Sequence, residues 1–323
     1  MRYRNWIYKQ KIFDRYAIIV NIILIMILTI VFAVMGNIKQ ISFCDEMFTY
    51  TSANSDMPIG DSYSVLQTGE WISGKQVRDF LSAAEVSLSI YKQISYYLYK
   101  DHVPLYFWIF RTISVLLYKN SCTKWIGLVC NYPFYVGLGI FINDFFRKRF
   151  GTVFSFLGTL LVMLHPCMIA QATFIRMYQM FTFIIVVFML LMRSERLKST
   201  KYRLIMGVIL AIGCLIHYHF WIYVIAFSGF YGLALLVKKE YKQIFYYIQT
   251  CIIGLLITTI CYPVWVIFLF SGKGELSINN LFNLSTLLKD AKMGINAVIS
   301  FVFGESVYLW GNVMWINNCI HVH

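Results

Sequence analysis

Residues 16–35 read YAIIVNIILIMILTIVFAVM, and this stretch decides the class of protein. Only Asn21 and Thr29 interrupt an apolar run of about 20 residues, the length that an α-helix needs to cross the hydrocarbon core of a bilayer. The run is too long for a signal-peptide core and lacks a small-residue cleavage site, so we expect it to persist as an anchor. The preceding residues 1–15 carry five basic side chains, which predict a cytoplasmic N-terminus.

The composition of the whole chain predicts a multi-span membrane protein. Hydrophobic residues make up 59% of the 323 residues and aromatic residues 18%, whereas only 13% are charged. A net charge of +13 would suit a nucleic-acid partner, but the Lys and Arg residues stand in short clusters between apolar stretches. Such clusters are typical of membrane topology, so we expect a lipid bilayer as partner and no nucleic acid.

Four basic clusters set the expected topology, and we expect all four on the cytoplasmic side of the membrane. They are the N-terminus and residues 147–149, 193–203 and 238–242. The apolar stretches between the clusters predict six further spans within residues 125–270. One of these stretches, residues 204–237, has a basic cluster at each end, so it must cross the membrane twice, with its apex near residues 217–219. Residues 271–323 are expected to form an outer segment, followed either by an eighth span or by another interfacial stretch.

The segment 103–118 decides the path of the chain between the first two spans. It is short, and Arg111 stands at its centre, where a charge facing lipid costs several kcal/mol. We therefore expect a helix that begins at Pro104 and lies on the outer membrane interface. Residues 36–124 then form one long extracytoplasmic loop with interfacial helices. The predicted fold is all-α, a single integral membrane domain over residues 1–323 with about seven or eight transmembrane helices.

This topology places a set of polar side chains near the outer face of the membrane. Its members are Asp45, Glu46, Asp101, His102, Arg176, Tyr178, His217 and His219. Nucleotide sugars are confined to the cytoplasm, so a sugar donor at the outer face would be a polyprenyl-phosphate sugar. A carboxylate can take the proton of an acceptor hydroxyl, and an arginine offers a planar fork of donors to phosphate oxygens.

Three short motifs stand in a characteristic order. They read FCDEMFTY at residues 43–50, DHVPLY at residues 101–106 and RMY at residues 176–178. In this order, over residues 16–220, they resemble the GT-C glycosyltransferases, and most of all the bacterial branch related to protein O-mannosyltransferases and the lipid A aminoarabinose transferase. Two departures are a valine at position 103, where the branch usually has a proline, and the end of the sequence at residue 323, which suggests a fragment or a short member.

The resemblance implies an inverting transfer of a sugar from a polyprenyl-phosphate donor to a protein, lipid or glycan acceptor at the extracytoplasmic face of the cell membrane. It implies Asp45 as the general base. From the chemistry of the side chains we expect Glu46 to support Asp45 or to bind a metal. The lipid phosphate is expected to be held by residues of the remaining set: Arg176, His102, Asp101, Tyr178, His217 and His219. A divalent metal at Glu46, Asp101, His217 or His219 is left open, because the ligand set is incomplete.

Simpler interpretations and two other classes of function stay open at this point. Acids at positions 45 and 46 would also suit the first turn of an interfacial helix. Arg176 could extend to the headgroups, and Asp101 or His102 could cap the helix that follows. A polytopic transporter or flippase would use intramembrane polar residues as a substrate path. A non-catalytic subunit would bind a lipid-linked sugar without transferring it.

Overall fold

The computed structural model describes residues 2–266, except for residues 41, 55–70, 72, 84–87, 98–101 and 120. The chain divides into two compact units, Met1–Trp265 and Val266–His323, and all of the second unit but its first residue lies outside the described residues. The expectations for residues 271–323 and for Asp101 therefore concern residues that the structure does not describe.

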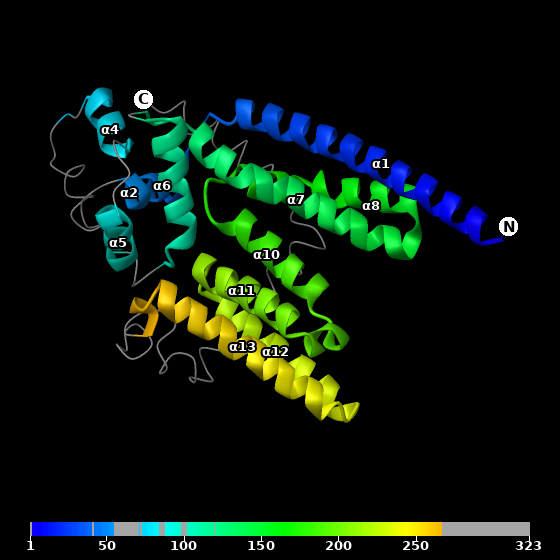
Figure 1. The fold of residues 1–323 in the computed structure, drawn as a ribbon. Coiled ribbons are helices and arrows are strands. Elements are labelled where there is room, and N and C mark those ends of the chain that lie inside the picture. Colours follow the sequence, from blue (N-terminus) through cyan, green and yellow to red (C-terminus); the bar gives the residue numbers. More distant parts are fainter. Residues whose placement is uncertain are drawn as a thin grey trace, which may run out of the picture. The chain divides into compact units, whose positions relative to one another are not determined.

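All regular elements of the described residues are helices, which confirms the predicted all-α class (Figure 1). The seven predicted spans of residues 16–270 correspond to helices at the expected places. These helices are α1 (Arg2–Ile38), α7 (Trp125–Phe150), the pair α8 (Thr152–Met163) and α9 (Pro166–Thr173), α10 (Tyr178–Leu191), α11 (Thr200–Ile216), α12 (His219–Val237) and α13 (Tyr241–Cys261).

Four of these helices are long and apolar enough to cross a membrane, namely α1, α7, α12 and α13. The pair α8 and α9 would be a fifth span with a bend of 61°. The bend falls where Pro166 opens α9 and the His165 side chain accepts a hydrogen bond from the Cys167 amide. With 14 and 17 residues, α10 and α11 are short for a bilayer, so the total of about seven or eight spans stays a prediction.

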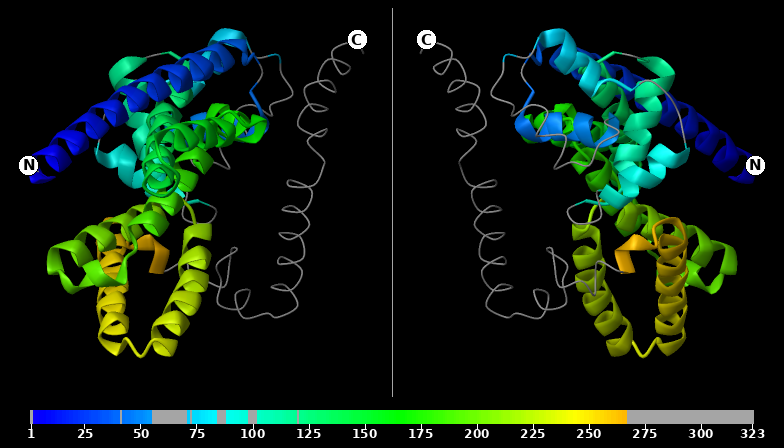
Figure 2. Two further views of the ribbon diagram at one scale, coloured as in Figure 1. Left: turned by 90° about the vertical axis from the view of Figure 1, so that its right-hand side faces the viewer. Right: turned by 90° about the vertical axis from the view of Figure 1, so that its left-hand side faces the viewer.

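The loop between the first two long helices contains four described helices, α2 (Cys44–Asn54), α4 (Gly74–Leu81), α5 (Leu88–Tyr97) and α6 (Leu105–Leu117). In Figure 1 they gather at one end of α1 and α7. The N-terminus of α1, the α7–α8 turn, the 3-10 helix η1 (Ser194–Lys198) and the α12–α13 turn lie toward the opposite end. Figure 2 shows α12 and α13 as a pair that meets at this last turn. The four basic clusters thus share one end of the described helices, as the predicted topology requires.

Helix α6 runs crosswise to α1 and α7 in Figure 1, as expected for an interfacial helix. It begins at Leu105, with Pro104 as its N-cap residue. Arg111 is only 1% exposed, because it points into the protein and its Nη1 donates a 2.7 Å hydrogen bond to the carbonyl oxygen of Asn54, at the end of α2. The charge at the centre of α6 is therefore directed at the C-terminal end of α2, where the carbonyl groups carry partial negative charge, and it does not face lipid.

The apolar core of the described residues has two parts. One part packs α1 against α7 and α8 around Leu24, Leu28 and Met163. The other joins α2 and α6 to α10 and α11. Because α7 contributes to both parts, it connects α1 to the helices of the long loop and supports the turn between α9 and α10.

Candidate active site

Residues 174–177 form the turn between α9 and α10, and three side chains fix its backbone. The Ile175 amide donates to Glu46 Oε1 at 2.7 Å, and the Ile175 carbonyl accepts from Thr49 Oγ1 at 3.0 Å. Asn131 of α7 donates from Nδ2 to the Phe174 carbonyl at 2.7 Å. These contacts come from α2 and α7, so the position of Arg176 depends on segments far away in the sequence.

A glycine in α7 accommodates the same turn. Ile175 is fully buried, and a Cβ atom at Gly127 would lie 2.0 Å from its Cγ2 atom. Only a residue without a side chain allows this approach between α7 and the turn. The packing and the hydrogen bonds together hold the turn in one position.

Glu46 is a structural residue in this arrangement. Its carboxylate is fully buried, with Lys39 Nζ at 2.8 Å, the Phe43 amide at 2.9 Å and the Ile175 amide at 2.7 Å. The contact with Phe43 caps the first turn of α2, as an acid at the third helical position commonly does. Both carboxylate oxygens are occupied, so this geometry favours the supporting role that we expected for Glu46 over metal binding.

Asp45 differs from its neighbour because its side chain is exposed. Among the described residues its carboxylate has no hydrogen-bond or ion-pair partner. Its carbonyl oxygen, in contrast, accepts hydrogen bonds from Arg176 Nη1 at 3.2 Å and from Thr49 Oγ1 at 3.3 Å. The backbone of Asp45 is thus fixed against Arg176, while its carboxylate is available to a substrate.

Arg176 is only 4% exposed, which argues against an arginine that extends to the headgroups. Its Nη2 lies 3.1 Å from His102 Nε2, and its guanidinium lies 5.3 Å from the centre of the Phe48 ring. A guanidinium can only donate, so His102 Nε2 must accept, and the His102 ring is neutral with its proton on Nδ1. The ring of His102 is also stacked on Phe107, with 5.9 Å between ring centres.

His102 is not the N-cap residue of the helix that follows it, because that position is Pro104, whose side chain makes no capping hydrogen bond. The alternative of Asp101 as a cap concerns a residue that the structure does not describe. The described geometry instead assigns His102 to the contact with Arg176.

His217 and His219 lie in the tight turn between α11 and α12. The His219 amide lies 3.1 Å from His217 Nδ1, and the His219 Nδ1 atom lies 3.0 Å from the same atom. The His217 ring packs against Tyr178, with 5.8 Å between ring centres. Burial, followed by the positive charge of neighbouring groups such as Arg176, lowers the pKa of His217 to about 3. His217 is therefore neutral near pH 7, whereas His219 is exposed.

The structure brings together most of the side chains that we predicted from the sequence. Arg176 contacts both the backbone carbonyl of Asp45 and the side chain of His102, and the ring of Tyr178 packs against His217. Sequence reasoning missed Thr49 and Asn131, which position the turn. The only signal for Asn131 was its polar side chain within an apolar stretch.

Among the described residues no group of three or more His, Cys, Asp or Glu side chains could hold a metal ion. No known protein family, curated protein or solved structure matches this chain. The resemblance to GT-C glycosyltransferases therefore stays a prediction. A functional assignment has to rest on the geometry around Asp45, His102 and Arg176.

Proposed function

We propose that this chain is a membrane glycosyltransferase that moves a sugar from a polyprenyl-phosphate donor to an acceptor hydroxyl at the extracytoplasmic face. The observation that carries the proposal is an exposed carboxylate, Asp45, on a residue whose backbone is bound by the buried cation Arg176. Helix α2, which carries Asp45, lies at the end of the helices opposite to the turns that carry the basic clusters (Figure 1). A substrate with a phosphate at the headgroup level and a tail in lipid fits this position.

The proposed reaction is a single displacement. Asp45 takes the proton of the acceptor hydroxyl as its oxygen forms a bond to the anomeric carbon of the sugar. The bond from this carbon to the phosphate oxygen breaks, and its electron pair leaves with the polyprenyl phosphate. Attack from the face opposite to the leaving group inverts the anomeric centre. The proton on Asp45 then passes to water.

The leaving phosphate needs positive charge and hydrogen-bond donors nearby. His219 is exposed and Tyr178 half-buried, so these two side chains are the accessible donors on this side of the group. Arg176 is a buried cation, and among the described residues its Nε has no hydrogen-bond partner. Direct contact between Arg176 and a phosphate would require the turn to open when the donor binds.

The test is an assay of the purified chain in detergent with a panel of synthetic undecaprenyl-phosphate hexoses and pentoses as donors and a membrane extract as the source of the acceptor hydroxyl. We expect release of undecaprenyl phosphate with one class of sugar, and NMR of the product should show an inverted anomeric centre. A product of retained configuration would contradict the single displacement. Movement of the lipid-linked sugar across a vesicle membrane without any glycosidic product would favour a transporter instead.

A further inference from the structure

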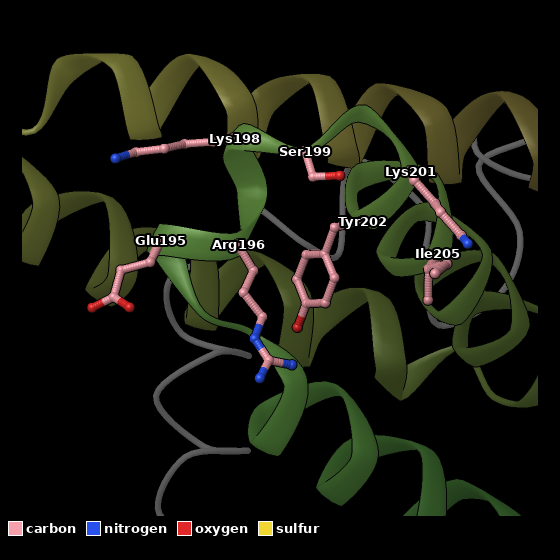
Figure 3. A pocket seen from close by; sticks show the side chains of 7 residues that line it. All are labelled: Glu195, Arg196, Lys198, Ser199, Lys201, Tyr202 and Ile205. Atoms are coloured by element: carbon pink, nitrogen blue, oxygen red, sulfur yellow. The ribbon is translucent and has the colours of Figure 1, made fainter.

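A second charged region lies in the connection between α10 and α11, toward the end of the helices that carries the basic clusters (Figure 1). Residues 193–203 contain five basic side chains and one acidic side chain. A cavity of about 320 Å³ lies against η1. Figure 3 shows the side chains that line it: Glu195, Arg196, Lys198, Ser199, Lys201, Tyr202 and Ile205.

Contacts with the protein core give this connection a defined conformation. Leu197 is fully buried. Arg203 Nη1 donates to the carbonyl oxygens of Leu197 at 2.7 Å and Lys198 at 3.0 Å. The Tyr202 hydroxyl donates to the Leu191 carbonyl, at the end of α10. A ligand would therefore meet a backbone that is already ordered, which lowers the entropic cost of binding.

The three cations that line the cavity have no acceptor in the part of the chain that the structure describes. Among the described residues, no oxygen accepts a hydrogen bond or forms an ion pair with the side chains of Arg196, Lys198 or Lys201. The Arg196 guanidinium lies 5.8 Å from the centre of the Tyr202 ring. In Figure 3 these two side chains lie next to each other, with Lys198 and Lys201 extending on either side. The three cationic groups point in different directions, so they would attract an anionic head group through their combined charge and not by jointly binding one phosphate.

An exposed apolar surface follows the cations along α11. Leu204, Ile205 and Val208 are 49%, 44% and 43% exposed. Ile205 also lines the cavity. In a membrane protein such a surface contacts acyl chains, so cations and a lipid-facing surface lie side by side. A ligand that satisfies both has an anionic head and an apolar tail.

We propose that this cavity binds the phosphodiester head group of an anionic phospholipid, whose acyl chains lie along the exposed face of α11. Basic pockets next to membrane helices on the cytoplasmic side are suited to such head groups. Free phosphate would satisfy the cations but would leave the apolar surface unused. The proposal is independent of sugar transfer, because it involves the opposite end of the helices and no residue of the candidate active site.

The test is native mass spectrometry of the purified chain in a neutral detergent, titrated with phosphatidylglycerol. The triple variant Arg196→Gln, Lys198→Gln, Lys201→Gln should bind the lipid roughly 100-fold more weakly, since each cation near a lipid phosphate contributes about fivefold. The matched control is Lys238→Gln, Lys239→Gln, Lys242→Gln, which removes the same charge from the α12–α13 turn. Its affinity should stay within about twofold of the unchanged chain.

Three results would overturn the proposal. The first is that the triple variant of Arg196, Lys198 and Lys201 binds the lipid as tightly as the unchanged chain. The second is that both triple variants lose affinity equally, which would indicate general charge attraction. The third is that glycerol 1-phosphate competes as well as the intact lipid, which would indicate a site for soluble phosphate. Should the first triple variant fail to fold, the single variants Lys198→Gln and Lys201→Gln replace it, each with an expected loss of about fivefold.

Discussion

Glu46 uses both of its carboxylate oxygens within the protein, whereas Asp45 directs its carboxylate outward. The difference arises from their positions in the first turn of α2. Glu46 is the third residue of α2, so its side chain can reach back to the Phe43 amide. The same side chain also contacts Lys39 and the Ile175 amide. Asp45, at the second position, has no such partner. Two adjacent acids therefore have separate tasks, one in positioning and one in the proposed chemistry.

The separate tasks predict different effects on stability. Glu46→Ala should lower the free energy of unfolding by about 3 kcal/mol, because it leaves Lys39 and two amides without their acceptor. Asp45→Ala should cost less than about 1 kcal/mol, since it removes only a favourable charge at a helix N-terminus. Unfolding of both variants in mixed detergent micelles measures this difference. Equal losses would contradict the structural role of Glu46.

His217 predicts a dependence of stability on pH. Its pKa is about 3 in the folded chain against an ordinary 6.5, so the folded state binds fewer protons than the unfolded state between these values. The contribution of neutral His217 to stability is complete above pH 6.5 and is lost as the pH falls toward 3. His217→Asn, which does not titrate, should lose less stability over this range. Thermal unfolding across the pH series checks the prediction, and parallel curves for both proteins would refute it.

The turn between α9 and α10 is the element on which the site depends. The apolar stretches and basic clusters were sufficient to predict the helices on both sides of it. They could not predict that Asn131 and Glu46 bind its backbone, because such contacts arise from tertiary packing between distant segments. The burial of Arg111 was missed for the same reason: its partner, the Asn54 carbonyl, lies 57 positions earlier in the chain.

Packing between α7 and this turn gives a prediction at the level of elements. Gly127→Ala should destabilise the chain by about 1–3 kcal/mol and reduce transfer activity, because Ile175 must shift and Arg176 moves with it. Gly229→Ala is the matched control, since a Cβ atom at Gly229 meets nothing within 4 Å and alanine favours the helix by up to about 1 kcal/mol. Unfolding and activity of both variants are measured together. A Gly127→Ala protein that behaves like the control would show that the turn is not fixed by α7.

On the scale of the whole described unit, the basic clusters lie toward one end and the candidate active site toward the other (Figure 1). The sequence predicted this separation, because the positions of the basic clusters and the lengths of the apolar stretches can be read without knowing how the helices pack. The size of the bend between α8 and α9, which is 61°, and the exact end of each helix did not follow from the sequence. Those features depend on local breaks and on neighbouring helices.

The proposed orientation can be tested with the exposed Cys44, which opens α2 beside Asp45. A membrane-impermeant maleimide should label Cys44 in intact cells, and peptide mapping should show no such label in a Cys44→Ser variant. In that variant, a cysteine introduced by Lys239→Cys should react only after the cells are permeabilised. Labelling of position 239 in intact cells would contradict the orientation.

The central claim is that the Asp45 carboxylate removes the proton of the acceptor during sugar transfer. The most direct measurement is the turnover of Asp45→Asn in the undecaprenyl-phosphate sugar assay, with Asp79→Asn, another exposed acid of the same loop, as the matched control. We expect turnover to fall by about 10²–10⁴-fold in Asp45→Asn, because asparagine cannot accept the proton, and to be unchanged in Asp79→Asn. Unchanged turnover of a folded Asp45→Asn protein would contradict the claim.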